Sequence, residues 1–501
     1  MNSHFVEETE PLLGGTTEIL NGHHQQQHHH RRRCQAENAS SSSDTLVDFD
    51  PKGDSANPQE WPKPFKWGIT MLLTLMGFAV TFNCVGVVPV ASRISADLSH
   101  GTADKSASVL LVTIWELGEA AGPLLIAPLS ETVGRYPVIN VCTTLFVLAT
   151  AGAALSRSTA AFVTARLLSG LFVTSNVLNP AVVGDMFGPE DRGSPMSLCL
   201  LSPLIGGAVG PAISGAVAET LSWRWALWIA AGLAALCEVL FLTCFRETYR
   251  AAILKKRAKA RGDGEHVDGE RGLRGLLEAI ARPGFVFRSS GVLMALSLYG
   301  SVIFAQFYVV SVTLPDILTE IYGLSPAQTG FGLMSFSVGS SASLVFCNTF
   351  LDRIYVKLRA ANDGRGLPEH RLPISIAGGL ALPVAMAAYG WIAHLALPLW
   401  ALLLSVMVFG NALMLANVPL SAYVVDAFGP YSASAMTGLI VARCLMGTFL
   451  PLLTTPLIEG FGRGWAFTVL AGANLVLAPV PMLVFRYGER WRRGSKYTRD
   501  A

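Results

Sequence analysis

The chain has 501 residues, of which 51% are hydrophobic and 14% are charged, whereas an ordinary soluble domain has about a quarter charged residues. Its mean hydropathy is +0.45, and its formal net charge of +2 is too small to indicate a nucleic-acid partner. Long apolar runs recur, and each reaches the roughly 20 residues that cross a bilayer. The composition excludes a soluble globular protein and indicates a polytopic protein whose partner is the lipid bilayer.

The first 60 residues show no apolar periodicity and contain the stretches HHQQQHHHRRR and SSSSD. Such a segment cannot bury enough apolar surface to fold, so residues 1–60 are predicted to be a disordered cytoplasmic tail. The histidine run is predicted to be solvated, and neither a metal nor a cofactor is expected. The stretch ETEPLL, from Glu8 to Leu13, has the spacing that adaptor proteins read as an endosomal or vacuolar address. It keeps the vacuolar membrane open as an alternative to the plasma membrane.

Apolar runs fill most of the remaining chain and predict twelve membrane spans. The predicted spans are 67–90, 106–128, 137–155, 160–184, 196–218, 224–246, 289–313, 327–350, 374–394, 398–423, 432–458 and 464–487. They do not alternate between apolar and polar residues as barrel strands do, so they are predicted to be helices. All cysteines except Cys34 fall inside these runs and are predicted to be small buried hydrophobic residues without a disulfide framework.

Basic residues are concentrated between the sixth and seventh runs, after the eighth run and in the C-terminal tail. The positive-inside rule places these segments and both termini in the cytoplasm. The predicted organisation is an N-terminal six-helix half at 61–246, a basic cytoplasmic loop at 247–288, a C-terminal six-helix half at 289–487 and a cytoplasmic tail at 488–501.

The chain contains an internal duplication at an offset of 241 residues. NVLNPAVVGDMFGP begins at Asn176 near the end of the fourth run, and NVPLSAYVVDAFGP begins at Asn417 near the end of the tenth. At this offset Asp185 aligns with Asp426, and Gly206 aligns with Gly447. The repeats are six runs apart and therefore point the same way. An all-α membrane protein of two parallel six-helix halves, with a central site between them, is expected.

Several motifs resemble the major facilitator superfamily, in particular the fungal drug:proton antiporter group with twelve spans. APLSETVGR, from Ala127 to Arg135, resembles the family's signature G-x-L-x-D-R-x-G-R, with Ala127 in place of the glycine and Glu131 in place of the aspartate. ARLLSG resembles the fourth-helix motif, whose buried arginine is Arg166. GGAVGPAISG, from Gly206 to Gly215, resembles the fifth-helix antiporter motif, which in the family separates exporters from many uptake carriers.

The loop motif also has a physical interpretation. Gly134 permits a tight turn, and Arg135 is predicted to pair with Asp185 at the inner end of another helix while Glu131 holds the loop from the other side. Asp426 is the equivalent acid in the second half. These residues are the candidate cytoplasmic gate, and a basic loop that only sets topology is the alternative. In the fifth helix, the candidate antiporter residues are Gly206, Gly210, Pro211 and Gly215, for which simple helix packing is the alternative.

The stretch WELGEAAG places two glutamates, Glu116 and Glu119, one turn apart inside an apolar helix. A charge at mid-bilayer costs roughly 2.5–3.5 kcal/mol on insertion scales, so such groups usually face a cavity or a partner. Two nearby carboxylates in a poorly solvated cavity resist full ionisation, and at least one is predicted to bind the coupling proton. Glu119 is expected to dominate, because Gly118 and Gly122 are predicted to leave open space beside it.

The alternative for the pair is a packing hydrogen bond or neutralisation by a buried arginine. The resemblance assigns no role here, because the family commonly has apolar residues at both positions. The other candidate cavity residues are Arg166, Arg443, Glu238 and Asn83.

Other functional classes are less consistent with the sequence. There is no Gly-Lys pair, so the phosphate-binding loop of an ATP-driven pump is absent, and the soluble segments hold no catalytic constellation. The protein is therefore predicted not to be an enzyme. It is expected to be a monomeric, proton-coupled secondary transporter that exports a small amphipathic drug, antifungal or self-made toxin by alternating access. The alternative is a proton-coupled uptake or vacuolar carrier for a nutrient such as a polyamine.

Overall fold

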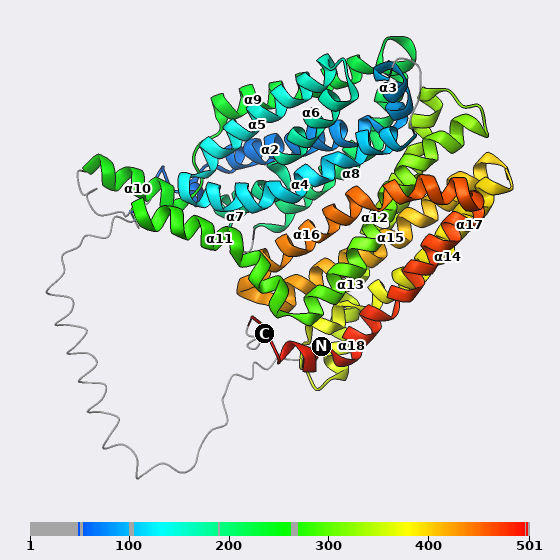
Figure 1. Cartoon of the computed structure of the whole chain (residues 1–501). Coiled ribbons are helices and arrows are strands. Elements are labelled where there is room, and N and C mark those ends of the chain that lie inside the picture. The colour runs from blue at the N-terminus through cyan, green and yellow to red at the C-terminus, as the bar shows by residue number, and fades with distance from the viewer. Residues whose placement is uncertain are drawn as a thin grey trace, which may run out of the picture. The chain divides into compact units, whose positions relative to one another are not determined.

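The structure of the protein is a computed structural model that describes residues 49–50, 54–99, 105–188, 191–261, 269–495 and 497–498. The histidine run and the Glu8–Leu13 stretch lie outside the described residues. Figure 1 shows that the described part is built from helices, and no strand occurs among those residues.

The first half contains six membrane passages. They are formed by α2 (Lys63–Gly86), α4 (Lys105–Val133), α5 (Arg135–Leu155), α6 (Thr159–Leu171) with α7 (Ser175–Met186), α8 (Gly193–Thr220) and α9 (Trp223–Cys244). The first passage is prolonged by η2 (Val88–Val90) and α3 (Ala91–Leu98), and the fourth is interrupted between α6 and α7. These helices agree with the first six predicted spans to within a few residues at most ends.

The second half follows the same plan. Its helices are α12 (Gly291–Glu320), α13 (Pro326–Ala361), α14 (Pro373–His394), α15 (Leu399–Phe428), α16 (Ser432–Phe449), α17 (Thr454–Leu477) and α18 (Pro479–Arg492). Short 3-10 turns η3 (Pro368–Arg371), η4 (Gly429–Tyr431) and η5 (Pro451–Leu453) join some of them.

Eleven segments of the described chain are long and apolar enough to cross a membrane, and the last of them, Ser432–Arg492, has 61 residues. A single crossing needs only about 20 residues, so this segment is long enough for two. Gly462 divides it, because its backbone has φ 72° and ψ 164°, a conformation that favours glycine and breaks the helix. The segment therefore contains the eleventh and twelfth passages, and the predicted boundary between 458 and 464 coincides with this break.

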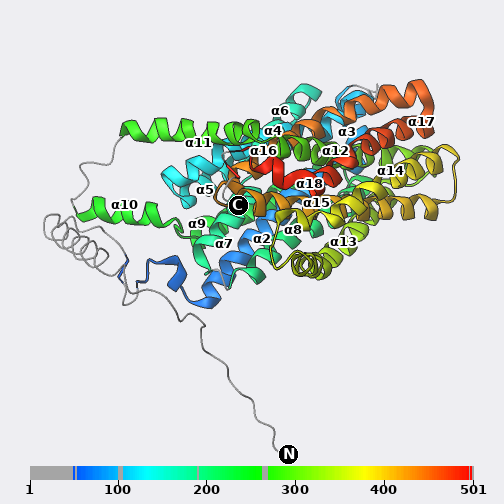
Figure 2. The ribbon, with the colours of Figure 1, turned by 90° about the horizontal axis from the view of Figure 1, so that it is seen from below.

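The two halves repeat the same packing. In the first half α2 packs on α8, α4 on α6, and α5 on α9. In the second half the equivalent pairs are α12 on α16, α13 on α15, and α14 on α17. The duplication read from two short motifs thus extends to the whole arrangement of helices. The halves meet where α8 packs on α13 and α4 packs on α16 (Figures 1 and 2).

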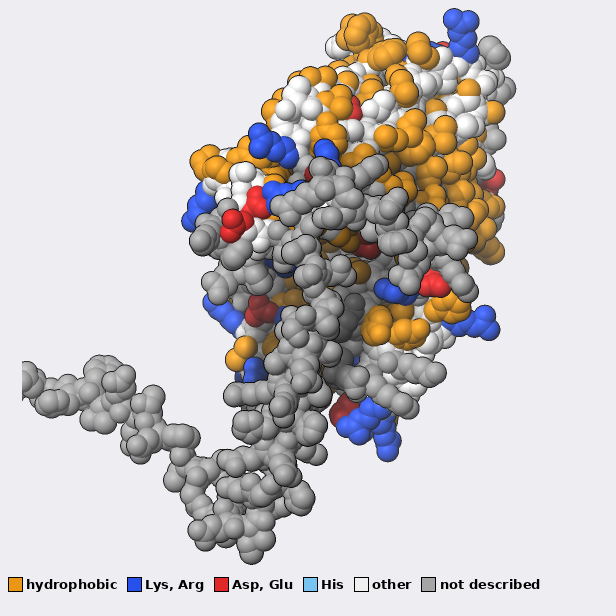
Figure 3. All heavy atoms as spheres, turned by 90° about the vertical axis from the view of Figure 1, so that its left-hand side faces the viewer, with side chains coloured by type: hydrophobic (Ala, Val, Ile, Leu, Met, Phe, Trp, Pro, Cys, Tyr) orange, Lys and Arg blue, Asp and Glu red, His pale blue; other side chains and the backbone are white. Residues whose placement is uncertain are grey.

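The segment predicted as the central loop contains two helices, α10 (Arg250–Arg261) and α11 (Gly269–Ser289). α11 packs against α4 of the first half and α16 of the second. Its Val286 is fully buried, and Phe287 faces Gly438. Figure 3 shows lysine and arginine side chains scattered among large hydrophobic areas on the face of the molecule nearest α10.

The predicted disorder of the tail up to residue 60 is wrong for its last residues. Arg257 of α10 donates two hydrogen bonds to Asp54, one of them 2.7 Å long, and they hold the pKa of this carboxyl below its usual range. Trp61 is buried and donates from its indole N–H to the carbonyl of Ser55 at 3.1 Å. Charge pairing and one buried aromatic ring therefore order this segment, which shows no periodicity in its sequence.

Candidate functional site

A cavity of about 560 Å³ lies between the two halves. Its wall combines residues of α2, α4, α7 and α8 with residues of α12, α13, α15 and α16. Ligand pockets commonly have volumes of about 300–1,000 Å³ and mostly apolar linings with a few polar groups. The lining here fits that description: aromatic rings are contributed mainly by α12 and α13, and two carboxylates by α4.

Glu116 of α4 reaches across the cavity to the other half. Its side chain is buried, and the hydroxyl of Tyr308 in α12 donates a hydrogen bond of 2.6 Å to Glu116 Oε1. The second oxygen, Oε2, accepts no hydrogen bond from a described residue, although the thiol of Cys444 in α16 lies within 4.8 Å of the carboxylate. Gly447 of α16 lies against this side of Glu116, since a Cβ atom placed there would be in ordinary contact with Oε2 at 3.5 Å. Glu116 is thus a carboxylate that touches both halves and retains free hydrogen-bonding capacity.

Glu119 has different surroundings. It accepts hydrogen bonds from Trp115 Nε1 at 3.0 Å and from Asn176 Nδ2 at 2.7 Å. Both donors belong to the first half, to α4 and α7. The sequence placed the two glutamates on one face of a helix, and the structure brings both to the cavity wall, but only Glu116 joins the halves.

The expectation that glycines leave open space beside Glu119 is wrong. A Cβ atom on Gly118 would lie 2.2 Å from the carbonyl oxygen of Leu167, and one on Gly122 would lie 2.7 Å from that of Leu171. Both glycines face α6 and allow the two helix backbones to approach closely, which is the common use of small residues between membrane helices.

Arg166 and Asn83 lie in the wall behind the cavity. Arg166 is fully buried, donates hydrogen bonds of 2.9 Å to the carbonyls of Asn83 and Cys84, and stacks over the ring of Trp115 at 4.6 Å. The side-chain amide of Asn83 donates to Thr150 Oγ1 at 3.0 Å. Neither residue lines the cavity.

Glu238 lies apart from these residues, between α9 and α5, where it accepts a hydrogen bond of 3.1 Å from Thr144. It is absent from the cavity wall. Arg443 of α16 does line the cavity and stacks over Phe304 at 4.1 Å from the ring centroid. In the described part of the chain, neither Arg166 nor Arg443 forms an ion pair with Glu116 or Glu119, so neutralisation by direct contact with an arginine is not seen.

Glu116, Glu119 and Cys444 each offer one atom within 4.8 Å of the others, the spacing that could hold a metal ion. Glu116 and Glu119 line the cavity already described, and Cys444 follows the cavity residue Arg443 in α16. We assign no metal to them.

The candidate gate residues meet at the start of α5. Arg135 Nε lies 3.4 Å from Asp185 Oδ2, and Asp185 also accepts a hydrogen bond of 3.2 Å from Thr248. Gly134, with φ 113°, makes the turn that precedes α5. Glu131 is exposed, and its expected role in holding the loop stays a prediction.

The loop is held by Glu247, a residue that the sequence did not single out. Its carboxylate accepts hydrogen bonds from the backbone N–H groups of Arg135 at 2.9 Å and Tyr136 at 3.1 Å. An anion at the first turn of a helix is stabilised by the unpaired N–H groups and the helix dipole. The only sequence signal was an acid directly after the sixth apolar run, beside several basic residues.

The second half carries an equivalent pair. Arg371, just before α14, places Nε 2.9 Å from Asp426 Oδ2 and also pairs with Asp352. A buried ion pair, Arg492 with Glu369, lies beside it at 2.8 Å. Each of these networks stays within one half. In sequence Arg371 is one of several basic residues after the eighth run, but the duplication of Asp185 as Asp426 signals that a partner arginine should exist.

The fifth-helix motif faces two neighbours. Cβ atoms on Gly206 and Gly210 would lie 3.0–3.2 Å from backbone atoms of α2, so these glycines serve packing within the first half. Gly215 faces Pro326, and Pro211 faces Gly330, so this end of the motif packs on α13 of the other half. The packing interpretation accounts for all four residues, and the second pair also brings the halves together.

Comparisons with known proteins agree with this architecture. Residues 71–451 match the family described as the Major Facilitator Superfamily. "Efflux pump radE" of Floropilus chiversii is 29% identical over 90% of this chain and 86% of its own length. "MFS transporter cpaT" of Aspergillus oryzae is 30% identical over 92% and 95%, and "MFS-type transporter phm3" of a Pyrenochaetopsis species is 31% identical over 90% and 94%.

Solved structures show the same fold. A D-xylose-proton symporter superposes with a TM-score of 0.65 at 17% identity, covering 83% of this chain and 97% of its own. The human organic anion transporter MFSD10 superposes with a TM-score of 0.59 at 19% identity, covering 84% and 100%. The family match spans more than half of the chain, and relatives at 30% identity span nearly all of it. The chain therefore belongs to the major facilitator superfamily and is a multi-pass membrane transporter of small molecules, not an enzyme.

Proposed function

We propose that the protein exports small amphipathic molecules across the plasma membrane by proton-coupled alternating access, acting as a monomer. Several similar proteins are named efflux pumps or transporters of the same superfamily. The observation that carries the proposal is Glu116, a buried carboxylate that accepts a hydrogen bond from Tyr308 of the opposite half and has one oxygen that accepts no hydrogen bond from the described part of the chain.

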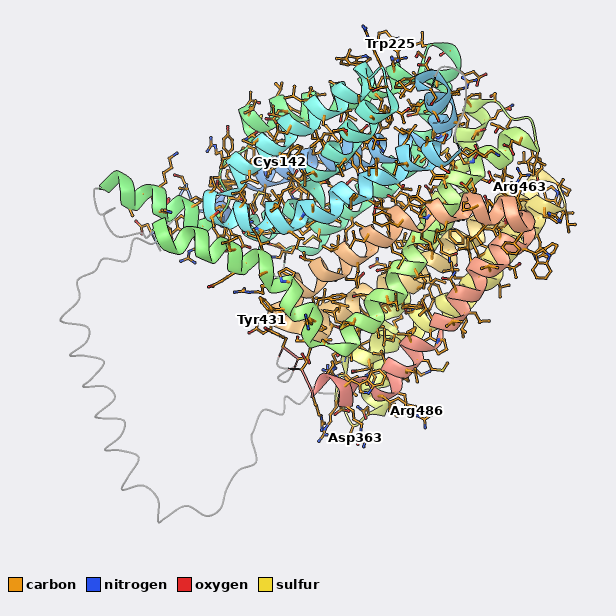
Figure 4. All side chains as sticks on the ribbon, in the orientation of Figure 1. Cys142, Trp225, Asp363, Tyr431, Arg463 and Arg486 are labelled. Carbon is orange, nitrogen blue, oxygen red and sulfur yellow. The ribbon has the colours of Figure 1, made fainter. Side chains whose placement is uncertain are left out.

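The contacts between the halves support a conformation that is closed at one end. Away from the central helices α10 and α11, Lys105 pairs with Glu320 at 3.2 Å, and the backbone N–H of Ala327 donates to Glu219 at 3.1 Å. Figure 4 shows Arg463, a second partner of Glu320, at this end of the second half, with Asp363 and Arg486 at the other. If the basic end is cytoplasmic, the cavity faces the cytoplasm.

In this conformation the cycle begins with a guest in the cavity. A hydrogen-bond donor of the guest competes with a proton for the free oxygen of Glu116. Loss of the proton to the cytoplasm and closure of the halves around the guest then lead to release on the other side, and a proton from outside resets the carboxylate. Because a buried unpaired charge is costly, the carboxylate favours conformations in which a proton, a guest or Tyr308 satisfies it.

The mechanism is tested by separating the two energy sources. Efflux of anionic, neutral and cationic fluorescent amphipathic dyes is measured in turn in cells that express the full chain. We expect at least one of these dyes to be exported. An uncoupler added at constant ATP should abolish that export. Reversing the pH gradient in proteoliposomes should reverse the flux. Export that persists after uncoupling would rule out the proton-driven mechanism, and accumulation driven by the normal gradient would favour the uptake carrier.

Tyr308→Phe tests the bond across the cavity. The change keeps the aromatic ring, which packs against Phe304 and Phe307, and removes only the hydroxyl. Ionised Glu116 then loses a donor, and hydrogen bonds to charged groups contribute about 1.5–3 kcal/mol. We expect the pH optimum of export to move to higher pH by about one unit or more, with surface expression unchanged. Tyr389→Phe is the matched control, because its hydroxyl pairs with Thr313 outside the cavity wall. An unchanged pH profile in Tyr308→Phe would exclude this bond from proton coupling.

A further inference from the structure

Arg443 lines the cavity with its hydrogen-bond donors unused. No hydrogen bond or ion pair joins its guanidinium to any described residue, and its Nε is buried without an acceptor. A guanidinium carries five N–H donors and stays charged in proteins. Ionisable groups at membrane depth are costly and are almost always paired, so open donors in a cavity wall indicate a ligand.

Arg166 provides an internal comparison. It is also an arginine in a membrane helix beside the same cavity, and it also stacks on an aromatic ring. Its Nε is also buried without an acceptor among the described residues, but its two terminal nitrogens donate to the carbonyls of Asn83 and Cys84, whereas those of Arg443 have no such acceptors. The fold supplies acceptors to the arginine in the wall and supplies none to the arginine that faces the cavity.

Two nearby carboxylates balance the charge of Arg443, although they do not accept hydrogen bonds from its N–H groups. Glu116 and Glu119 attract the guanidinium through space, although no ion-pair contact joins them. This attraction lowers the cost of a cation at this depth, and the N–H groups remain free for a molecule in the cavity. Phe304 lies under the guanidinium plane at 4.1 Å and fixes its orientation through a cation–π contact.

The neighbouring wall is aromatic. Phe307 contacts Tyr308 with 5.0 Å between ring centroids and Phe336 with 4.8 Å. All three rings line the cavity together with Phe304. A flat apolar ring system on the guest would pack against this wall, which adds about 0.5–1.5 kcal/mol per aromatic pair to the burial of apolar area.

We propose that Arg443 and Phe304 form an anchoring subsite for guests that carry an acceptor oxygen, a carboxylate or a carbonyl, beside a planar apolar ring system. The inference rests on the proposed function only in taking the cavity as the transport site. The planar fork of arginine donates two parallel hydrogen bonds to the two oxygens of a carboxylate, and it can also donate to a single carbonyl oxygen. Arg443 stays charged throughout the cycle, so it selects the guest, while competition between guest and proton occurs at Glu116.

The test uses three probes that share one ring system: pyrenebutyrate, pyrenebutanamide and pyrenebutylamine. The full chain is placed in lipid nanodiscs without a pH gradient, and binding is followed by energy transfer from tryptophan, since Trp115 lines the cavity. Empty nanodiscs correct for probe in the lipid. We expect the butyrate and the amide to bind at least about ten-fold more tightly than the amine.

Arg443→Gln should weaken binding of the butyrate and the amide by about ten- to a hundred-fold and leave the amine within about two-fold. Arg443→Lys keeps the charge but not the planar fork, and it should lose about three- to ten-fold for the same two probes. If Arg443→Gln unfolds, Arg443→Lys carries the test. Two results would overturn the subsite. One is tightest binding of the amine by the unaltered protein, and the other is that Arg443→Gln and Arg443→Lys both keep the order of probe affinities of the unaltered protein. Since no gradient is used, selective binding without proton-driven export would contradict only the proposed function.

Discussion

At the scale of single residues, the two glutamates of α4 differ in what they touch. Glu119 accepts hydrogen bonds from Trp115 and Asn176 of its own half. Glu116 accepts one from Tyr308 of the other half, and its second oxygen accepts none from any residue that the structure describes. A fully satisfied carboxylate holds local structure, whereas a partly satisfied one between two moving bodies responds to a proton or a guest. The structure therefore moves our expectation for the coupling proton from Glu119 to Glu116.

Replacing each glutamate by glutamine separates these roles. Glu116→Gln should lower export driven by a pH gradient at least about ten-fold and remove its pH dependence, because the group no longer titrates. Glu119→Gln should lower export only about two- to five-fold but destabilise the fold by about 1–3 kcal/mol, since an amide cannot accept from both donors as well as a carboxylate. Initial efflux rates are measured between pH 5 and 8 at equal surface expression and give the effect on export. Thermal unfolding gives the effect on the stability of the fold. Normal proton-driven efflux by the double variant would show that the pair only packs.

At the scale of helices, charged groups at helix ends form one network in each half. Arg135 and Asp185 join the start of α5 to the end of α7, and Glu247 caps α5. Arg371 and Asp426 repeat the pair at the start of α14 and the end of α15. Both networks lie within one half, so in this conformation they brace each half rather than bridge the two. If the pair of Arg135 and Asp185 breaks during transport, the effects of replacing its two residues on export should be coupled.

A double-mutant cycle measures that coupling. Arg135→Ala and Asp185→Ala should each reduce efflux, and the double variant should be less harmed than the sum of the two, with an interaction energy of about 0.5–3 kcal/mol. Arg135→Ala combined with Asp426→Ala is the control and should be additive, because these residues belong to separate networks. Strict additivity for Arg135 and Asp185 would remove the pair from the mechanism and favour a loop that only sets topology.

At the scale of the whole molecule, the halves are closed together by backbone packing more than by charge. The Lys105–Glu320 pair is about half exposed, and exposed pairs contribute at most about 1 kcal/mol. The seam of α8 and α13 is much tighter, since a Cβ atom on Gly330 would lie 2.3 Å from the carbonyl oxygen of Pro211. Glycine here permits a contact between backbones that an added methyl group would prevent.

Gly330→Ala should therefore open the end away from the central helices α10 and α11. The population should shift towards the opposite-facing conformation, by about ten-fold or more if the clash costs over 1.4 kcal/mol. The measurement is labelling of Cys84, which lines the cavity, by a charged thiol reagent added to one side of the membrane, in a variant without the other cysteines. Labelling should fall from the side of the central helices and rise from the other. Gly232→Ala is the control, because no atom lies within 4 Å of a Cβ placed there. Equal labelling in both variants would mean that this seam does not govern the closed end.

The sequence by itself determined the class, the spans and the repeat. Run length and hydropathy are local properties that a bilayer reads directly, so the helices formed where apolar runs were long enough. The motifs around Asp185 and Asp426 placed the duplication, and the loop motif from Ala127 to Arg135 indicated Arg135 as a partner for Asp185. Membrane insertion leaves few alternatives at this level, because every backbone polar group must be satisfied within a helix.

Apart from the pair of Arg135 and Asp185, only the tertiary structure decided which side chains meet. Tyr308 adds a single hydroxyl to an aromatic run, and Glu247 and Arg371 resemble ordinary charges that set topology. No local pattern in the sequence separated these residues from their neighbours. Gly118 is next to Glu119 in sequence but faces α6, because helical rotation turns adjacent residues to different sides. Contacts between helices depend on rotation, register and the approach of two halves that lie hundreds of residues apart. For that reason the charges of the cavity were visible in the sequence, and their partners were not.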